Sequence, residues 1–200
     1  MITRQLDSAV RRAQIVSAAK KLIAKYGSEH LTVRRIAREV GVSEGAIYKH
    51  FKSKKEVLYF LVDEIEELLL EDIRESRTAG LGAPDVLEKT ITAHISSVEK
   101  RSGMSFQVIA EIISFGDKKL NGRISEVINR YISCIKEVLT EGIKTGTIRR
   151  DVDLDAAAAL FFGMVQGLIN IWALDHSSFD LKQKCAALFG VFRRSISAGC

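Results

Sequence analysis

The sequence predicts an all-α protein, with a small N-terminal bundle of three helices followed by a larger helical domain, about nine helices in total. Apolar residues recur at helical spacing through most of the 200 residues, and the chain contains a single proline. Near residue 41, a glycine separates two short amphipathic segments, which indicates a tight turn between two helices. With 46% hydrophobic and 28% charged residues, the chain is apolar enough to bury a core.

The first helix is predicted to run from Asp7 to Tyr26. Gly27 follows it, and glycine commonly ends a helix because it adopts positive φ without steric strain. Arg11 and Arg12 lie near the start of the helix, where contact with a phosphate backbone and exposure to solvent are equally compatible with the pattern. The inward stripe is expected to contain Ile15, Ala18, Ala19, Leu22, Ile23 and Tyr26.

Two short helices follow, and capping residues mark their ends. Thr32 and Ser43 are the expected N-caps, because a hydroxyl at this position accepts a hydrogen bond from a backbone N–H group of the first turn. Gly41 ends the first of the two helices, and Ile47 and Phe51 are expected to face inward from the second. This arrangement is a helix-turn-helix, a motif whose second helix can enter the major groove of DNA.

The segment resembles the DNA-binding domain of the tetracycline-repressor (TetR) family of transcriptional regulators. The resemblance rests on residues 31–37 (LTVRRIA), 41–43 (GVS) and 46–51 (AIYKHF), together with Lys54. It implies base contacts from Arg34, Glu44, Gly45, Ala46 and Lys49. It implies contacts to backbone phosphates from Thr32, Ser43, Tyr48, His50 and Lys54. For Tyr48 and His50, packing of the turn is the alternative to phosphate contact.

Positive charge is concentrated in the N-terminal part of the chain. Residues 1–55 hold 13 Lys/Arg and 4 Asp/Glu, a net charge of +9, whereas residues 56–200 carry −4. A basic region joined to a mildly acidic body is typical of a nucleic-acid-binding domain followed by a domain with another role. The sequence therefore predicts a DNA-binding domain over residues 1–53 and an effector-binding and dimerisation domain over residues 54–200.

The second domain is predicted to begin with a long helix over residues 53–77, for which Ser53 and Glu56 have the spacing of a capping box. Its acidic side chains are expected on a solvated outer face: Glu64, Glu66, Glu67, Glu71, Asp72 and Glu75. Further helical patterns cover residues 84–100, 104–115 and 120–145.

Residues 156–174 are apolar on nearly every side. Such a helix either spans a membrane or is buried all round, and Gln166 and Asn170 in its middle favour burial. In a chain of this size, a second subunit is the simplest cover for one side. The last helix, residues 181–196, is expected to face inward through Leu181, Cys185, Leu188, Phe189 and Phe192. We therefore predict a homodimer through the last two helices, with no membrane contact.

A pocket for a small apolar effector is expected between the helices over residues 104–115, 120–145 and 156–174. Gln166 and Asn170 lie one turn apart on a face that is otherwise apolar, and a buried amide needs a hydrogen-bond partner. That partner is either the effector or a residue across the dimer. The expected lining residues are Phe106, Ile109, Ile113, Tyr131, Phe162, Gln166 and Asn170.

The sequence contains no nucleophile–histidine–acid signature, phosphate-binding glycine loop or dinucleotide motif, and its four histidines lack the spacing of metal ligands. We therefore expect no catalysis, cofactor or metal. Cys134, Cys185 and Cys200 are far apart and odd in number, which is typical of reduced thiols, and the N-terminus lacks the apolar run of an export signal. Both observations predict a cytoplasmic protein.

The resemblance to the TetR family implies a homodimeric transcriptional repressor that binds a short palindromic operator in double-stranded DNA and is released by an effector, and the apolar candidate lining predicts a small hydrophobic one. An activator or a ligand-independent DNA-binding protein would have the same sequence features. An enzyme or carrier that retains a helix-turn-helix is the alternative from another class, and the missing catalytic constellation argues against it.

Overall fold

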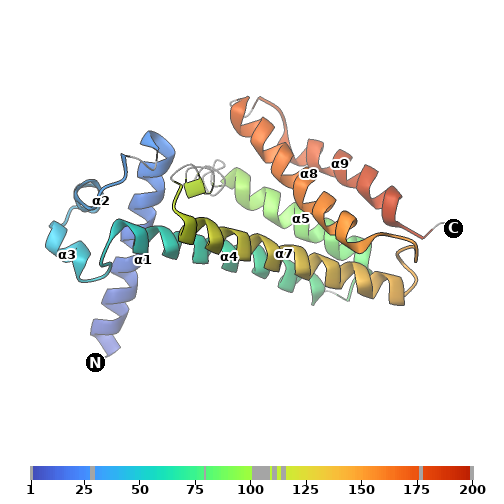
Figure 1. The fold of residues 1–200 in the computed structure, drawn as a ribbon, viewed down its shortest axis with the longest axis horizontal. Coiled ribbons are helices and arrows are strands. Elements are labelled where there is room, and N and C mark those ends of the chain that lie inside the picture. The colour runs from blue at the N-terminus through green and yellow to red at the C-terminus, as the bar shows by residue number, and fades with distance from the viewer. Residues whose placement is uncertain are drawn as a thin grey trace. The chain divides into compact units, whose positions relative to one another are not determined.

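The computed structural model describes residues 2–27, 30–78, 80–100, 109, 112–113, 116–175 and 178–198. Over these residues the chain is helical apart from its connecting segments and one isolated β-bridge, so the predicted all-α class is confirmed (Figure 1). Helical residues at 109 and 112–113 lie where a further helix is expected. Helices with defined bounds are α1 (Ile2–Tyr26), α2 (Val33–Val40), α3 (Glu44–Tyr48), α4 (Lys54–Arg77), α5 (Ala83–Lys100), α7 (Lys118–Lys144), α8 (Leu154–Leu174) and α9 (Leu181–Ile196).

The chain divides into two compact units. The first unit contains residues 1–65 and 104–125, and the second contains residues 66–103 and 126–200. Helices α1, α2 and α3 therefore belong to the first unit, and α5, α8 and α9 belong to the second. The continuous helices α4 and α7 contribute residues to both units.

In the first unit, α2 packs against both α1 and α3 (Figure 1). The shared core contains Ile15 and Ala19 from α1, Ile36 from α2, and Ile47 from α3, all of which are fully buried. Tyr26, which was expected to face inward, is instead 45% exposed. Its ring lies at the surface beside two cationic side chains rather than in the core.

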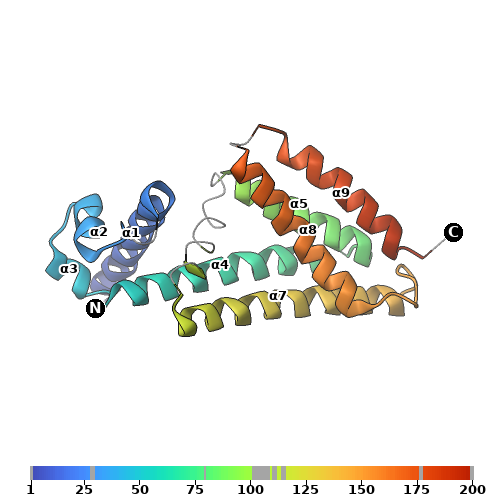
Figure 2. The ribbon, with the colours of Figure 1, turned by 45° about the horizontal axis from the view of Figure 1, so that its top comes forward.

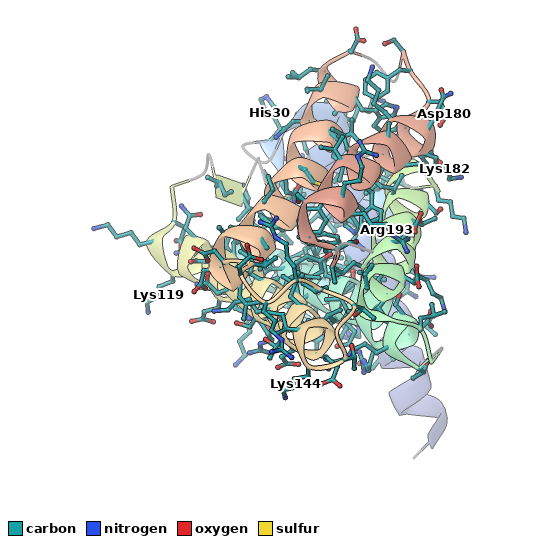
Figure 3. All side chains as sticks on the ribbon, turned by 90° about the vertical axis from the view of Figure 1, so that its right-hand side faces the viewer. His30, Lys119, Lys144, Asp180, Lys182 and Arg193 are labelled. Atoms are coloured by element: carbon teal, nitrogen blue, oxygen red, sulfur yellow. The ribbon has the colours of Figure 1, made fainter. Side chains whose placement is uncertain are left out.

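In the second unit, α9 packs against α5 on one side and α8 on the other (Figure 2). Arg193 of α9 lies next to α5 (Figure 3), where its guanidinium group donates hydrogen bonds of 2.7 Å to Asp85 and to Glu88. Leu188, which was expected to face inward, is 38% exposed because it lies at the edge of the buried stripe. That stripe contains Leu181, Cys185, Phe189, Phe192 and Ile196.

Helix α7 passes very close to the start of α5 and to the segment that follows α7 itself. A Cβ atom at Gly142 would lie 2.5 Å from Ile148 and 2.7 Å from Ala83, so only glycine fits there. Ile148 also forms the isolated β-bridge with Ser197, which ties the segment after α7 to the end of α9. These contacts hold α5, α7 and α9 together without a longer strand pair.

Candidate nucleic-acid interface and effector site

The helix-turn-helix has the capping geometry that its sequence predicts. The Thr32 hydroxyl accepts a hydrogen bond of 3.2 Å from the backbone N–H of Arg35, and the Ser43 hydroxyl accepts one of 3.2 Å from Ala46. Gly41 adopts φ 78°, and its N–H and that of Val42 both donate to the Ala37 carbonyl at 2.9 Å. The turn between α2 and α3 is therefore fixed by the backbone itself.

The recognition helix α3 is short, and it buries only one side chain of its five residues. Ile47 is fully buried, whereas Glu44, Gly45, Tyr48 and the following Lys49 are exposed. A Cβ atom at Gly45 would meet only the Ser43 hydroxyl, at 3.9 Å, so this part of the face is open. The exposed face thus carries one carboxylate, one ammonium group and a nearly bare centre.

The segment that follows α3 is held against α1. The Ser8 hydroxyl lies 3.4 Å from Nδ1 of the half-buried His50, and the Arg12 guanidinium stacks over the rings of Phe51 at 4.7 Å and Phe60 at 5.2 Å. These contacts constrain His50 while Tyr48 remains 53% exposed. Arg12, for which phosphate contact and solvent exposure were both considered, is thus part of the packing.

The start of α4 shows a modified capping box. The Ser53 hydroxyl accepts a hydrogen bond of 3.3 Å from the Glu56 N–H, and the Glu56 carboxylate accepts one of 2.6 Å from the N–H of Lys52 rather than of Ser53. The predicted helix start is therefore confirmed, and the reciprocal bond is displaced by one residue. Both bonds fix the backbone immediately before Lys54.

Two of the predicted effector residues lie together in the second unit. Tyr131 of α7 is buried, and its ring lies 6.0 Å from that of Phe162 on α8, at an interplanar angle of 60°. Gln166 follows Phe162 by one turn, and its buried amide oxygen has no hydrogen-bond partner among the described residues. Asn170, in contrast, is exposed on the outer side of α8, so of its two predicted partners, the effector and a residue across the dimer, its position favours the second.

Polar groups that sequence reasoning placed outside enter the second unit. Asp72 of α4 lies 3.8 Å from Nδ1 of His94 on α5, and both side chains are less than a fifth exposed. Glu66 is 7% exposed and pairs with Arg130 at 3.1 Å. The expected outward orientation of Glu66 and Asp72 is therefore wrong: Arg130 of α7 and His94 of α5 lie beside these two carboxylates, which are largely buried.

Burial raises the pKa of Tyr131 above its usual range, and the nearby Asp72 carboxylate raises it further. The phenol therefore remains a protonated hydrogen-bond donor at physiological pH. With His94, these residues bring polar groups from α4, α5 and α7 into an otherwise apolar interior, and we call Asp72, His94 and Tyr131 the interior polar cluster. Because these side chains come from different helices, the spacing of apolar residues within one helix does not predict that they meet.

The other predicted lining residues belong to a different part of the chain. Ile109 is half-buried and Ile113 is 50% exposed, and both fall within the first unit. Phe106 lies outside the described residues. No group of three or more potential metal-binding side chains occurs among the described residues.

One face of α8 and α9 is apolar and uncovered. Leu160, Ile171 and Leu174 are 56%, 60% and 79% exposed on α8, and Val191 is 58% exposed on α9. The opposite face of α8 packs within the unit through residues such as Phe161 and Trp172. Helix α8 is long and apolar enough to cross a membrane by length and composition, a test that core helices also pass. We call this uncovered surface the α8–α9 face.

Comparison with known proteins identifies the family. Residues 15–59 match the family model described as "Bacterial regulatory proteins, tetR family", and residues 60–193 match the "YsiA-like protein, C-terminal region". The Fatty acid metabolism regulator protein of Bacillus subtilis is 30% identical over 172 residues, which cover 84% of this chain and 86% of that protein. The Nucleoid occlusion factor SlmA of Vibrio cholerae is 27% identical over 161 residues, which cover 80% and 82%.

A solved structure supports the same assignment. The transcriptional regulator FadR from Bacillus subtilis, in complex with stearoyl-CoA, matches with a TM-score of 0.82 and 26% identity over 90% of this chain and 96% of that one. These relatives are regulators rather than enzymes, in agreement with the prediction that the chain is not catalytic. The chain belongs to the TetR family of bacterial transcriptional regulators.

Proposed function

We propose that this regulator is a cytoplasmic homodimeric repressor, which binds a short palindromic operator and is released when an apolar effector binds the second unit. The observation that carries the proposal is the capped α2–turn–α3 segment, whose exposed polar face follows a rigid glycine turn. Residues 1–53 would bind DNA, and residues 54–200 would bind the effector and form the dimer. Two consecutive family matches, over residues 15–59 and 60–193, support a division into two such parts.

The DNA contacts divide into two classes by position. The exposed face of α3 and the adjacent α2 would read base edges through Arg34, Glu44, Gly45, Ala46 and Lys49. The caps and the segment around the start of α4 would anchor phosphates through Thr32, Ser43, Tyr48, His50 and Lys54. Since Gly45 and Ala46 leave the centre of the face nearly bare, Glu44 and Lys49 would carry most of the direct readout.

The α8–α9 face supports a dimer of two identical chains. Its exposed leucine and isoleucine side chains would be buried by the same surface of a second copy, which is the contact that a two-fold axis produces. Gly163 and Gly167 lie on α8, and a Cβ atom at either position would have no described atom within 4 Å outside its own helix backbone and chain neighbours. These glycines would therefore serve close approach of a partner helix rather than packing within the unit.

The effector would be a molecule with a long apolar chain and a polar end. Two relatives point to this chemistry: one is named for fatty acid metabolism, and the other was solved with stearoyl-CoA. In this chain, the Tyr131–Phe162 ring pair would contact the apolar part. The unpartnered Gln166 amide and the interior polar cluster would orient the polar part.

Release would follow from a change in the distance between the two recognition helices. Two such helices engage one face of DNA only when their spacing matches one helical turn, about 34–36 Å. Helix α4 begins at Lys54 beside the DNA-binding segment and carries Asp72 of the polar cluster near its other end, without an intervening loop. A thousandfold loss of operator affinity would require about 4 kcal/mol of coupling between the two sites.

The test is operator affinity, measured by fluorescence anisotropy with and without saturating stearoyl-CoA, with free coenzyme A as the control ligand. We expect stearoyl-CoA to lower operator affinity at least tenfold and coenzyme A to leave it unchanged. In Gln166→Leu, stearoyl-CoA should lower operator affinity less. If no long-chain acyl compound binds or alters operator affinity, the second unit serves dimerisation alone.

A further inference from the structure

A basic cleft lies in the first unit, away from the exposed face of α3. The cleft has a volume of about 410 Å³ and lies between the last turns of α1 and the outer side of α2. Helices α1 and α2, which follow one another in the chain (Figure 1), pack on each other. Its lining consists of Lys21, Leu22, Lys25, Tyr26, Arg35, Arg38 and Glu39.

The cleft carries a concentrated positive charge. Its described lining residues include four cationic side chains and one carboxylate, that of Glu39, which gives these residues a net charge of +3. None of the four cations forms an ion pair of less than 4.0 Å with a described acidic residue, whereas the neighbouring Lys20 pairs with Glu64 at 2.6 Å. Four cations around one carboxylate repel one another on balance, and a bound anion relieves that repulsion.

An aromatic ring orders two of these cations. The Tyr26 ring has the Lys25 ammonium group 5.1 Å from its centroid and the Arg35 guanidinium group 5.4 Å from it. Arg35 also donates a hydrogen bond of 3.3 Å to the His30 carbonyl. These contacts hold the Arg35 fork in place before any ligand binds, which lowers the entropy cost of binding a phosphate. The exposure of Tyr26, unexpected from its place in an apolar stripe, is explained by this role.

The cleft continues the DNA-contact surface of the proposed function, on which this inference rests. In helix-turn-helix proteins, the helix before the recognition helix crosses the sugar–phosphate backbone. Arg34, at the start of α2, faces the half-site in that proposal, and Arg35 and Arg38 continue from it along the exposed side of α2 into the cleft. We propose that this cleft binds backbone phosphates of duplex DNA that flanks the half-site read by α3.

The test compares two duplexes and four proteins: the wild type, two double variants and Glu39→Gln. One duplex contains only the operator selected from a randomised library, and the other adds about 15 base pairs of arbitrary sequence on each side, which exceeds one helical turn. The double variant Lys21→Gln/Arg38→Gln removes two exposed cleft cations that form no hydrogen bond or ion pair with a described side chain. Lys144→Gln/Arg150→Gln removes the same charge from exposed positions of the second unit.

Wild-type protein and the Lys144/Arg150 control should bind the long duplex more tightly than the short one. The cleft variant should lose this gain, and its plot of log affinity against log salt should be less steep by about 1.8 on the long duplex, which corresponds to two phosphate contacts. On the short duplex its affinity should match that of wild type. Glu39→Gln should have the opposite effect and increase the preference for the long duplex, since it removes the one carboxylate of the cleft.

Equal affinity of the cleft variant and the wild type for the long duplex would overturn the proposal, as would equal losses on both duplexes. Failure of the wild type to bind either duplex would overturn the proposed function as well. The two failures are therefore distinguishable, because only the second removes binding to the short duplex. The Glu39→Gln result does not depend on the stability of the double variant.

Discussion

Replacement of Ile171 by alanine tests whether the α8–α9 face forms the dimer. Ile171 is 60% exposed in the single chain, so its truncation leaves little of the unit's own packing to be lost. In the proposed homodimer the side chain would be buried by the partner. The substitution therefore separates the stability of the dimer from the stability of the fold, which a core substitution could not do.

The magnitude follows from the area that remains to be covered. Full burial of an isoleucine side chain contributes about 1.5–3 kcal/mol. Ile171 is 60% exposed, so burial of its exposed part by a partner would contribute about 60% of that free energy, about 1–1.8 kcal/mol. A two-fold interface contains the residue twice, which doubles the loss to about 2–3.5 kcal/mol per dimer. The dimer dissociation constant should thus rise about 30- to 300-fold.

Sedimentation equilibrium over a wide range of protein concentrations measures this constant directly. Leu81→Ala is the matched control, since Leu81 is 43% exposed but lies in the connection before α5 rather than on the α8–α9 face. Far-ultraviolet circular dichroism and thermal melting at high protein concentration would verify that both variants fold. A dimer whose dissociation constant is unchanged by Ile171→Ala, or changed equally by both variants, would place the interface elsewhere.

Three further predictions concern the DNA-contact residues, the close packing at Gly142 and a buried thiol. Lys54→Ala should weaken binding to all duplexes about equally and lower the slope of log affinity against log salt by about one. Lys49→Ala should instead reduce discrimination at one or two base pairs by about 1–3 kcal/mol each. Affinities measured across a randomised site library would distinguish the two results. Gly142→Ala should destabilise the protein by about 1–3 kcal/mol in urea titration, because its Cβ would overlap Ile148 and Ala83. Burial raises the pKa of Cys185 to about 11, so its alkylation should be slow at pH 8 and should accelerate about tenfold per pH unit up to pH 10. Because the folded state holds this proton more tightly than the unfolded chain does, the thiol's contribution to stability should decline as the pH rises above 9.0, the usual thiol value.

The sequence predicted the helix-turn-helix in detail because local interactions determine it. The Thr32 hydroxyl caps α2 by accepting a hydrogen bond from the N–H group only three residues later, at Arg35. Gly41 ends the same helix because glycine adopts positive φ without steric strain. The buried positions Ile47 and Phe51 follow from helical spacing alone. Such features need no knowledge of the rest of the fold, and the structure confirms each of them.

The residues that sequence reasoning misplaced are those whose environment is made by another helix. Periodicity assigned Glu66 and Asp72 to a solvated face, but both are largely buried, beside Arg130 of α7 and His94 of α5 respectively. Tyr26 matched an apolar stripe, yet it orders two cations at a cleft with α2. The spacing of residues within one helix indicates which side of that helix is apolar. It does not indicate which of its polar side chains will find a partner on a neighbouring helix.

In helix α8, the spacing of apolar residues also fails to predict which side is buried. Because nearly every position is apolar, its periodicity cannot separate the side that faces the unit from the side that faces outward. Only the neighbouring helices assign Gln166 to the interior side and Asn170 to the exposed side, one turn apart on the same helix. The two amides are therefore not equivalent partners for one ligand. Gln166 adjoins the aromatic pair where an effector would lie, whereas Asn170 shares the α8–α9 face with Ile171 and Leu174. In a two-fold interface, such an amide can hydrogen-bond only across the dimer, where one polar pair among apolar contacts fixes the register of the two helices.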